Sequence, residues 1–139
     1  MNTNRIRYEY KKEISKEKVI ALYKSVEWSS AEKPDLLLKA LMNSDTLVTA
    51  SDGERLVGLG NAISDGYLVV YYPHLVVHPE YQSKGIGMEI MKLIQNRYHG
   101  FHQQSIIADG KAVGFYKKCG FVETGNCQSL WIYKGNDHD

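Results

Sequence analysis

The chain has 139 residues, 43% of them hydrophobic, and its 17 basic and 16 acidic side chains give a formal net charge of +1. This length predicts one domain that buries about two-thirds of its unfolded surface, and a near-neutral charge without a basic stripe argues against nucleic acid as a partner. No apolar run approaches the ~18 residues of a membrane span, and the N-terminus lacks a signal-peptide core, so we expect a cytoplasmic protein. The two cysteines lack metal-ligand spacing, so we expect reduced thiols and no metal site.

The first half of the chain predicts strands and two helices. Residues 5–10 alternate as a strand does, Ser15 is positioned to cap a helix, and Pro34 fits the first turn of a second helix. Residues 46–51 and 55–64 flank Asp52-Gly53 and predict a hairpin, because this dipeptide accepts the positive φ of a tight turn. Residues 67–77 form a long β-like run, in which Pro73 predicts a bulge or a break in pairing.

The second half of the chain alternates between helix and strand. Helices are expected at 87–98 and 111–119, the latter ended by Gly120, with a strand at 104–109 between them. Strands at 121–125 and 129–134 follow, and residues 135–139 are expected to fray. The predicted order is β-α-α-β-β-β-α-β-α-β-β, a single-domain mixed α/β (α+β) fold with helices on both faces of a mostly antiparallel sheet.

The turn between the long β-like run and the next helix has the character of an anion site. Residues 82–87 read QSKGIG, and two glycines at the start of a helix leave the first-turn N–H groups open to a phosphate, with Lys84 adding a cation. Alternatively, the glycines merely permit a tight strand-to-helix turn. The P-loop pattern is absent, and the dinucleotide pattern would need glycine where Ile90 stands.

Two motifs in this region resemble those of one known family. The pattern L-x-V-x-P-x-x-Q-x-x-G-x-G runs from Leu75 to Gly87, and AVGFYKKCGF at 112–121 looks like A-x-x-x-Y-x-x-x-G-F. Their order and separation are similar to those of the Gcn5-related N-acetyltransferases (GNAT), and ADGKAVGFYKKCGF looks most like the plant and cyanobacterial arylalkylamine branch. Where many members carry an asparagine that contacts pantetheine, this chain has Asp109.

The resemblance implies acetyl-CoA as cofactor, with its pyrophosphate on the main-chain amides of the turn and its pantetheine arm along the preceding strand. The cofactor-binding residues it implies are Leu75, Val76, Val77, Gln82, Ser83, Lys84, Gly85, Ile86, Gly87, Met88, Asp109 and Tyr116.

The resemblance also implies direct acetyl transfer to an amine in a ternary complex. Tyr116 falls on the family's tyrosine and would act as general acid for the leaving thiolate, while main-chain N–H groups between His74 and Val77 would hold the oxyanion. The base stays open between Tyr71, His74 and ordered water. Tyr71 is a poor base at neutral pH, and strand alternation turns His74 to the opposite face unless Pro73 bulges the strand.

On the acceptor side, Trp28, Tyr67 and Tyr72, with Tyr71, are expected to line a pocket for a small primary amine with an apolar body, and packing in the core is the alternative for each. Candidate partners for the protonated amine are Glu27, Asp35 and Asp65. A polyamine, an aminoglycoside, an amino sugar and a protein N-terminus or lysine remain open as acceptors. So do a silent acyl-CoA-binding domain and a homodimer formed through terminal strands.

Overall fold

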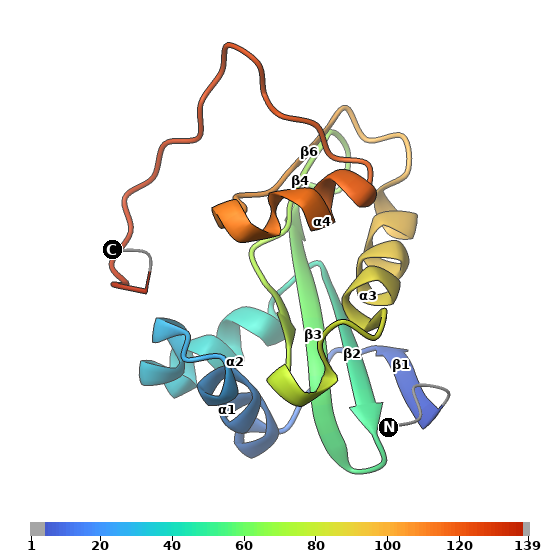
Figure 1. The fold of residues 1–139 in the computed structure, drawn as a ribbon, viewed down its shortest axis with the longest axis vertical. Helices are drawn as coiled ribbons and strands as arrows, with labels where there is room; N and C mark the ends of the chain where they lie inside the picture. The colour runs from blue at the N-terminus through green and yellow to red at the C-terminus, as the bar shows by residue number, and fades with distance from the viewer. Residues whose placement is uncertain (1–4, 138–139) are drawn as a thin grey trace.

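A six-stranded sheet runs through the middle of the protein, with helices on both faces, in a computed structural model that describes residues 5–137 (Figure 1). The strands are β1 (Ile6–Tyr10), β2 (Thr46–Asp52), β3 (Arg55–Ser64), β4 (Val69–Tyr71), β5 (Leu75–Val77) and β6 (Gln103–Ser105). The α-helices are α1 (Lys16–Ser25), α2 (Pro34–Met42), α3 (Ile86–Gln95) and α4 (Val113–Lys118). Short 3₁₀ helices lie at Ser29–Glu32 (η2), Pro79–Tyr81 (η3), Asn96–Tyr98 (η4) and Gly110–Ala112 (η5).

The sheet is mostly antiparallel, as the sequence predicts. Its strand order is β1-β2-β3-β4-β6, with β5 also paired to β3, and only the β4–β6 pair is parallel. Gly53 has a φ of +59° in the turn that joins β2 and β3, which confirms the hairpin expected at Asp52-Gly53. Ser15 and Pro34 occupy the helix starts expected of them.

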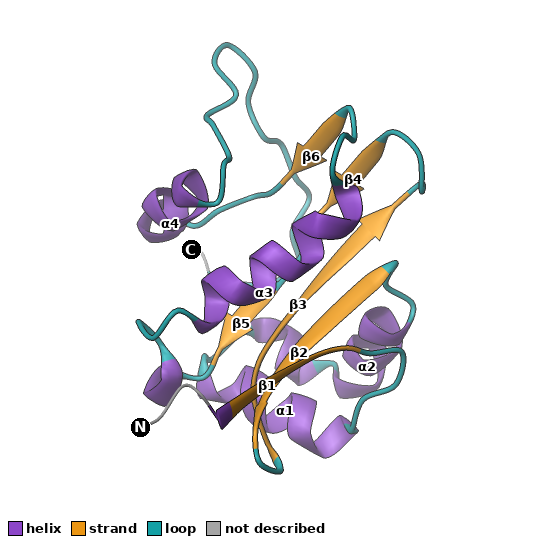
Figure 2. Cartoon of the chain, turned by 90° about the vertical axis from the view of Figure 1, so that its right-hand side faces the viewer, coloured by secondary structure: helices purple, strands orange, loops and turns teal. Residues whose placement is uncertain are grey.

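The core lies in two layers because neighbouring strand residues face opposite sides of the sheet. Leu47 packs with α1 and α2, whereas Val48 packs with α3. Figure 2 shows α3 lying along one face of the strands and α1 and α2 behind them. A Cβ on Gly60 would lie 2.8 Å from both Ile90 Cγ2 and Ile94 Cδ1, so the close approach of α3 to β3 requires a residue without a side chain.

The two strands expected at 121–125 and 129–134 are wrong. Within the described residues these segments pair with no strand, and residues 122–137, which we call the C-terminal arm, loop out from the end of α4 and return beside the first two helices (Figure 1). An alternating pattern yields a strand only where a neighbour accepts its hydrogen bonds, and here Val122, Leu130 and Ile132 are 85–93% exposed. Residues 135–137, expected to fray, lie against Ser29, while 138 and 139 fall outside the described residues.

No helix among residues 5–137 combines the length and the apolar character that crossing a bilayer requires.

Candidate active site

The long β-like run divides at Pro73 into β4 and β5, and both halves pair with β3. β4 pairs with Ile63 and Ser64, whereas β5 pairs with residues 58–60. Asn61 fills the gap between these two pairings. Its main-chain N–H donates to the His74 carbonyl (3.1 Å), its side-chain Oδ1 accepts from the His74 N–H (3.0 Å), and its Nδ2 donates to Ser44 Oγ (3.0 Å). The buried amide therefore replaces the ladder hydrogen bonds that the break removes.

Hydrogen-bond alternation decides which N–H groups of β5 stay open. His78 donates its N–H to the Val57 carbonyl, and Asn61 donates to His74, so the intervening antiparallel register directs the Val76 N–H toward Leu59. The N–H groups of Leu75 and Val77 then point to the other edge of β5, which has no partner strand among the described residues. This edge presents a row of donors, as an added strand or an extended arm requires.

The loop expected to bind phosphate begins immediately after η3. Gln82 Nε2 donates to the Val77 carbonyl (2.9 Å) and ties the loop to the end of β5, while Ser83 and Gly85 have φ of +63° and +86°. Gly85 precedes the first residue of α3, and a Cβ on it would meet no atom within 4 Å. At Gly87 a Cβ would lie 3.4 Å from the Phe115 ring, so this glycine also brings α4 close. The open first turn of α3 thus combines exposed N–H groups with the positive end of a helix dipole.

The other residues expected to bind the cofactor have different environments. Lys84 is exposed, Ile86 is buried in the core beneath α3, and Met88 Sδ accepts from Cys119 Sγ at 3.7 Å. The Val76 side chain is buried on the α1 side of the sheet, which leaves only its main chain near the open edge.

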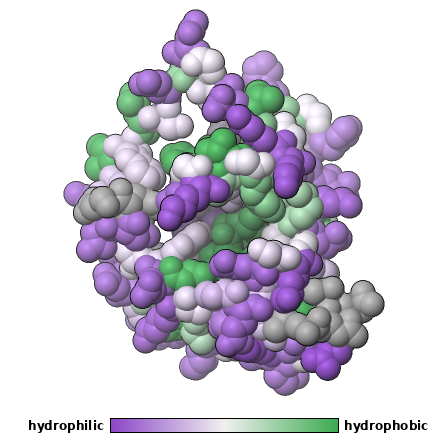
Figure 3. All heavy atoms as spheres, in the orientation of Figure 1, coloured by the Kyte–Doolittle hydropathy of each residue, from purple (hydrophilic) through white to green (hydrophobic). Residues whose placement is uncertain are grey.

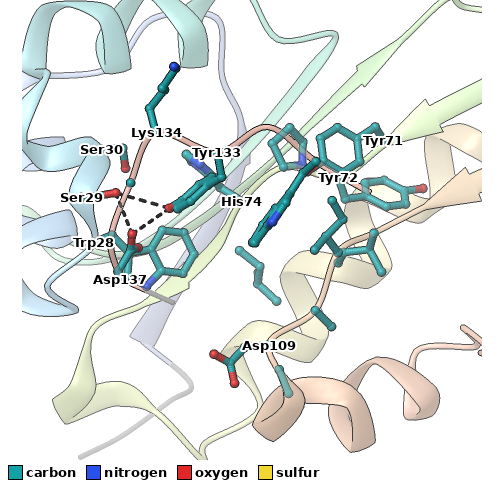
Figure 4. Close-up of a pocket in the computed structure, with 18 of the residues that line it drawn as sticks. Trp28, Ser29, Ser30, Tyr71, Tyr72, His74, Asp109, Tyr133, Lys134 and Asp137 are labelled. Carbon is teal, nitrogen blue, oxygen red and sulfur yellow. Dashed lines mark hydrogen bonds between the residues drawn. The ribbon is translucent and has the colours of Figure 1, made fainter. Parts of the chain in front are cut away.

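A cavity of about 570 Å³ opens beside the break in the strand. Figure 3 shows this face of the molecule hollowed near its centre, where apolar atoms gather inside a hydrophilic rim. The residues that line the cavity come from η2 and the residues flanking it, from residues 71–75, from 106–109, from α4 and from the C-terminal arm. Of the residues selected from the sequence, it brings together Trp28, Tyr71, Tyr72, His74, Leu75, Asp109 and Tyr116. The break is what allows consecutive residues of one strand to line the same cavity (Figure 4).

His74 lines this cavity and is held by aromatic neighbours. Its Nδ1 lies 2.8 Å from the hydroxyl of the buried Tyr23, and its ring meets Trp28 edge-on at 5.3 Å between centroids. Burial lowers the pKa of His74 to about 4, against a weaker opposing effect of the Asp137 carboxylate, and burial raises the pKa of Tyr23. At neutral pH the pair is therefore a neutral imidazole beside a neutral phenol. Only about one His74 in a thousand would carry a proton at pH 7.

The tyrosines of the cavity remain protonated at neutral pH. Burial, with a smaller contribution from Cys119, raises the pKa of Tyr116 to about 12, and burial also raises the pKa of Tyr71. Both phenols are therefore suited to donate a proton or a hydrogen bond and poorly suited to accept a proton. Tyr72 donates its hydroxyl to Gln104 Oε1 at 2.6 Å and is buried, so it lines the cavity chiefly with its ring.

Several residues expected on the acceptor side lie elsewhere. Tyr67 is 86% exposed in the turn before β4, and Asp65 holds that turn by accepting the N–H groups of residues 67–69. Asp35 is paired with Lys16 on the surface, and neither it nor Glu27 lines the cavity. Turn geometry and surface pairing use the same residue types as an amine site does, so residue type alone does not place these side chains in the cavity.

The cavity is also lined by residues that no sequence pattern singled out. Two of its carboxylates are Glu32 and Asp137, and two of its rings, Trp131 and Tyr133, belong to the C-terminal arm. Alternation places residues 131 and 133 on one side of an extended segment, which is the signal that could have grouped them. Nothing in the sequence indicates that this side faces the cavity.

Known proteins resemble this chain in sequence and in overall fold. The family described as Acetyltransferase (GNAT) domain matches residues 10–130. The chain belongs to the GNAT acetyltransferase family. Among curated proteins, an uncharacterized N-acetyltransferase, ycf52, from Gracilaria tenuistipitata var. liui is 35% identical over 69 residues, and its counterpart from Pyropia yezoensis is 31% identical over 90. The matches cover 48% and 60% of this chain but only 38% and 52% of those proteins.

Solved GNAT structures resemble the whole fold. A GNAT family acetyltransferase from Streptococcus pneumoniae superposes with a TM-score of 0.81 at 31% identity, covering 93% of this chain and 98% of that one. AAC(6')-Iy, solved with the bisubstrate analogue CoA-S-monomethyl-acetylneamine, gives a TM-score of 0.69 at 13% identity over 93% of this chain and 97% of that one, a likeness of fold alone. The predicted GNAT fold is thereby confirmed.

Proposed function

We propose that this GNAT chain transfers the acetyl group of acetyl-CoA to a primary amine of a small molecule, by direct attack in a ternary complex. One observation carries the proposal: the break between β4 and β5 opens a cavity beside an unpaired strand edge, and the glycine-bearing start of α3 follows the same strand. In this assignment the loop 82–87 binds the pyrophosphate, and the free edge of β5 binds the pantetheine arm. The thioester then lies in the cavity, where the amine meets it.

The proposed chemistry assigns a role to each group around the thioester. The Leu75 N–H, on the open edge of β5, donates to the oxyanion that forms when the amine nitrogen attacks the acetyl carbon. Tyr116, whose pKa of about 12 keeps it protonated, donates its proton to the departing sulfur. Asp109 also lines the cavity, and its carboxylate accepts the Lys111 N–H at 3.0 Å.

No side chain selected from the sequence is a strong base. A His74 pKa of about 4 is far below that of an alkylamine, close to 10, and the Tyr71 phenol is protonated. We therefore propose that the amine loses its proton to ordered water, with His74 and Tyr71 acting as neutral groups that orient the amine and that water. Trp28 and Tyr72 contribute aromatic surface to the acceptor side.

Calorimetry with acetyl-CoA, followed by a panel of amines with coenzyme A release as the readout, tests the proposal. Gly85→Glu should weaken acetyl-CoA binding by at least tenfold, since a carboxylate would occupy the anion position. Gly53→Glu is the matched control, because Gly53 also has positive φ and open space but lies in the β2–β3 turn. Equal affinity in both variants would refute the phosphate loop. Binding without turnover would indicate a silent acyl-CoA-binding domain.

We also propose that the protein is cytoplasmic and that two copies associate. Both cysteines, Cys119 and Cys127, are free thiols, which suits a reducing compartment. The terminal strands expected to pair in the dimer do not form, so we place the contact at the β3–β4 turn instead. Four apolar side chains are 41–86% exposed there: Ile63, Tyr67, Leu68 and Val69. Sedimentation velocity should give a dimer that Leu68→Ser weakens, and a monomer at all concentrations would refute the association.

A further inference from the structure

The side chain of Asn61 occupies a place that a main-chain hydrogen bond of the sheet would otherwise fill. Leu75 of β5 lies opposite Gly60 of β3, so the next step of the same antiparallel register brings His74 opposite Asn61. A regular pair at this position exchanges two main-chain hydrogen bonds. The Asn61 N–H does donate to the His74 carbonyl at 3.1 Å, but the His74 N–H donates at 3.0 Å to Asn61 Oδ1, a side-chain oxygen. The Asn61 amide is therefore inserted into the pair where the ladder stops.

A series of hydrogen bonds fixes the orientation of this amide. Asn61 is only 3% exposed, and its Nδ2 donates to Ser44 Oγ at 3.0 Å. Ser44 Oγ in turn donates to the Ala40 carbonyl in the last turn of α2, also at 3.0 Å. Because the Ser44 proton is directed to Ala40, the Ser44 oxygen is left to accept from Asn61, which turns Oδ1 toward His74. The break in the strand is thus connected to the end of α2, with every donor matched to an acceptor.

The orientation of the His74 main chain decides the direction of the N–H group that follows it. In a trans peptide unit the carbonyl of one residue and the N–H of the next point in opposite directions. The His74 carbonyl points to Asn61 on β3, so the Leu75 N–H points away from β3, to the open edge of β5 and the cavity that both residues line. Asn61 binds the main chain of His74 at its N–H and at its carbonyl, and Asn61 does not itself line the cavity.

We propose that Asn61 is a positioning residue for acetyl transfer, whose side chain keeps His74 out of the regular ladder and thereby aims the Leu75 N–H at the oxyanion. This inference rests on the proposed acetyl transfer. Asn61 acts through His74 and Leu75 and touches neither substrate, so it governs the rate of the chemical step and leaves the binding of acetyl-CoA and of the amine as it is. Complete removal of an oxyanion donor lowers kcat about 10²–10³-fold, and a misdirected donor should cost about 10- to 100-fold.

Two substitutions of about the same size separate the hydrogen bond from packing. Asn61→Leu fills the space without an acceptor, whereas Asn61→Asp keeps one oxygen for the His74 N–H and offers the other to the Ser44 hydroxyl. Asn61→Leu should lower kcat about 10- to 100-fold, while the amine KM and the Kd for acetyl-CoA change less than about twofold. Asn61→Asp should keep kcat within about threefold of the wild type, because the acceptor is restored.

The assay follows coenzyme A release at saturating acetyl-CoA, with the amine of the panel that the wild type acetylates fastest, and calorimetry gives the Kd for acetyl-CoA. In two-dimensional amide NMR spectra, the Leu75 resonance should shift on addition of acetyl-CoA in the wild type and in Asn61→Asp, and should shift less in Asn61→Leu. Ile6→Ala is the control for lost stability, since it truncates a core side chain on β1, at the far edge of the sheet, and should keep the wild-type kcat. Ser44→Ala removes the acceptor of Asn61 Nδ2 and should lower kcat about three- to tenfold.

The outcomes separate this inference from the proposed function. A wild-type kcat in Asn61→Leu would overturn the role of Asn61 while leaving acetyl transfer intact. A loss in Asn61→Asp or in Ile6→Ala as large as that in Asn61→Leu would do the same, as would parallel changes in kcat, KM and Kd. Should Asn61→Leu fail to fold, Ser44→Ala decides, and an unchanged kcat there would overturn the inference. Absence of acetyl-CoA binding by the wild type, or of transfer to any amine of the panel, would overturn the proposed function and this inference with it.

Discussion

His74 should make the stability of the protein unusually dependent on pH. Its pKa is about 4 in the folded chain, against an ordinary value of 6.5, because burial disfavours the imidazolium. The unfolded state therefore binds the proton more tightly. Above pH 6.5 both states are neutral and the folded state has its full stability. As the pH falls from 6.5 to 4, folding loses up to about 3 kcal/mol, since one pKa unit is worth about 1.4 kcal/mol.

Urea unfolding at pH 7.5 and at pH 4.0 measures this loss. Carboxylates also titrate in this range, so the informative quantity is the difference between the wild type and His74→Gln. Glutamine keeps a hydrogen-bonding partner for the Tyr23 hydroxyl but does not titrate. The wild type should lose about 3 kcal/mol more than His74→Gln. His102→Gln removes an exposed histidine and should follow the wild type. Parallel losses in the wild type and His74→Gln would show that His74 is not held neutral by burial.

Three further predictions follow from contacts described above. Asn61→Ala leaves the His74 N–H without its acceptor and should lower the free energy of unfolding by about 1–3 kcal/mol in urea, whereas Asn43→Ala, at an exposed helix end, should cost less than 1 kcal/mol. Gly60→Ala should destabilise by about 1–3 kcal/mol in thermal unfolding because α3 leaves no room, whereas Gly114→Ala, in open space on α4, should stabilise by about 0.5–1 kcal/mol; the same sign for both would contradict the packing. Tyr116→Phe should lower kcat about 10²–10⁴-fold with the Kd for acetyl-CoA unchanged, and with a wild-type pKa of about 12 the kcat profile should lack an ionisation of this tyrosine below about pH 11; unchanged turnover would remove it from the mechanism.

The features that could be predicted from the sequence are those set by short-range chemistry. Ser15 and Pro34 mark helix starts because caps and fixed φ act within one turn, and Pro73 marks the break because it lacks an N–H. The division of the β2 side chains between the two core layers likewise follows from a period of two, which sends Leu47 to one layer and Val48 to the other.

The features that could not be predicted depend on contacts between distant segments. The pattern at 129–134 is compatible with a strand, yet whether it pairs depends on an edge that the local sequence does not describe. The hydrogen bonds of Asn61 to His74, and the positions of the carboxylates Glu32 and Asp137 in the cavity, likewise depend on contacts between distant segments. A polar side chain acquires its role from neighbours that only the folded chain brings together.

The position of the C-terminal arm, late in the chain, has a consequence for the order in which the parts of the cavity form during synthesis. A ribosome releases the split strand and the start of α3 well before it releases the segment that carries Trp131 and Tyr133. The part of the site assigned to acetyl-CoA can therefore assemble on the nascent chain. At that stage the part assigned to the acceptor amine still lacks the cavity wall formed by the C-terminal arm. A premature stop codon after α4 would leave a polypeptide that retains the residues assigned to acetyl-CoA but lacks one wall of the acceptor cavity.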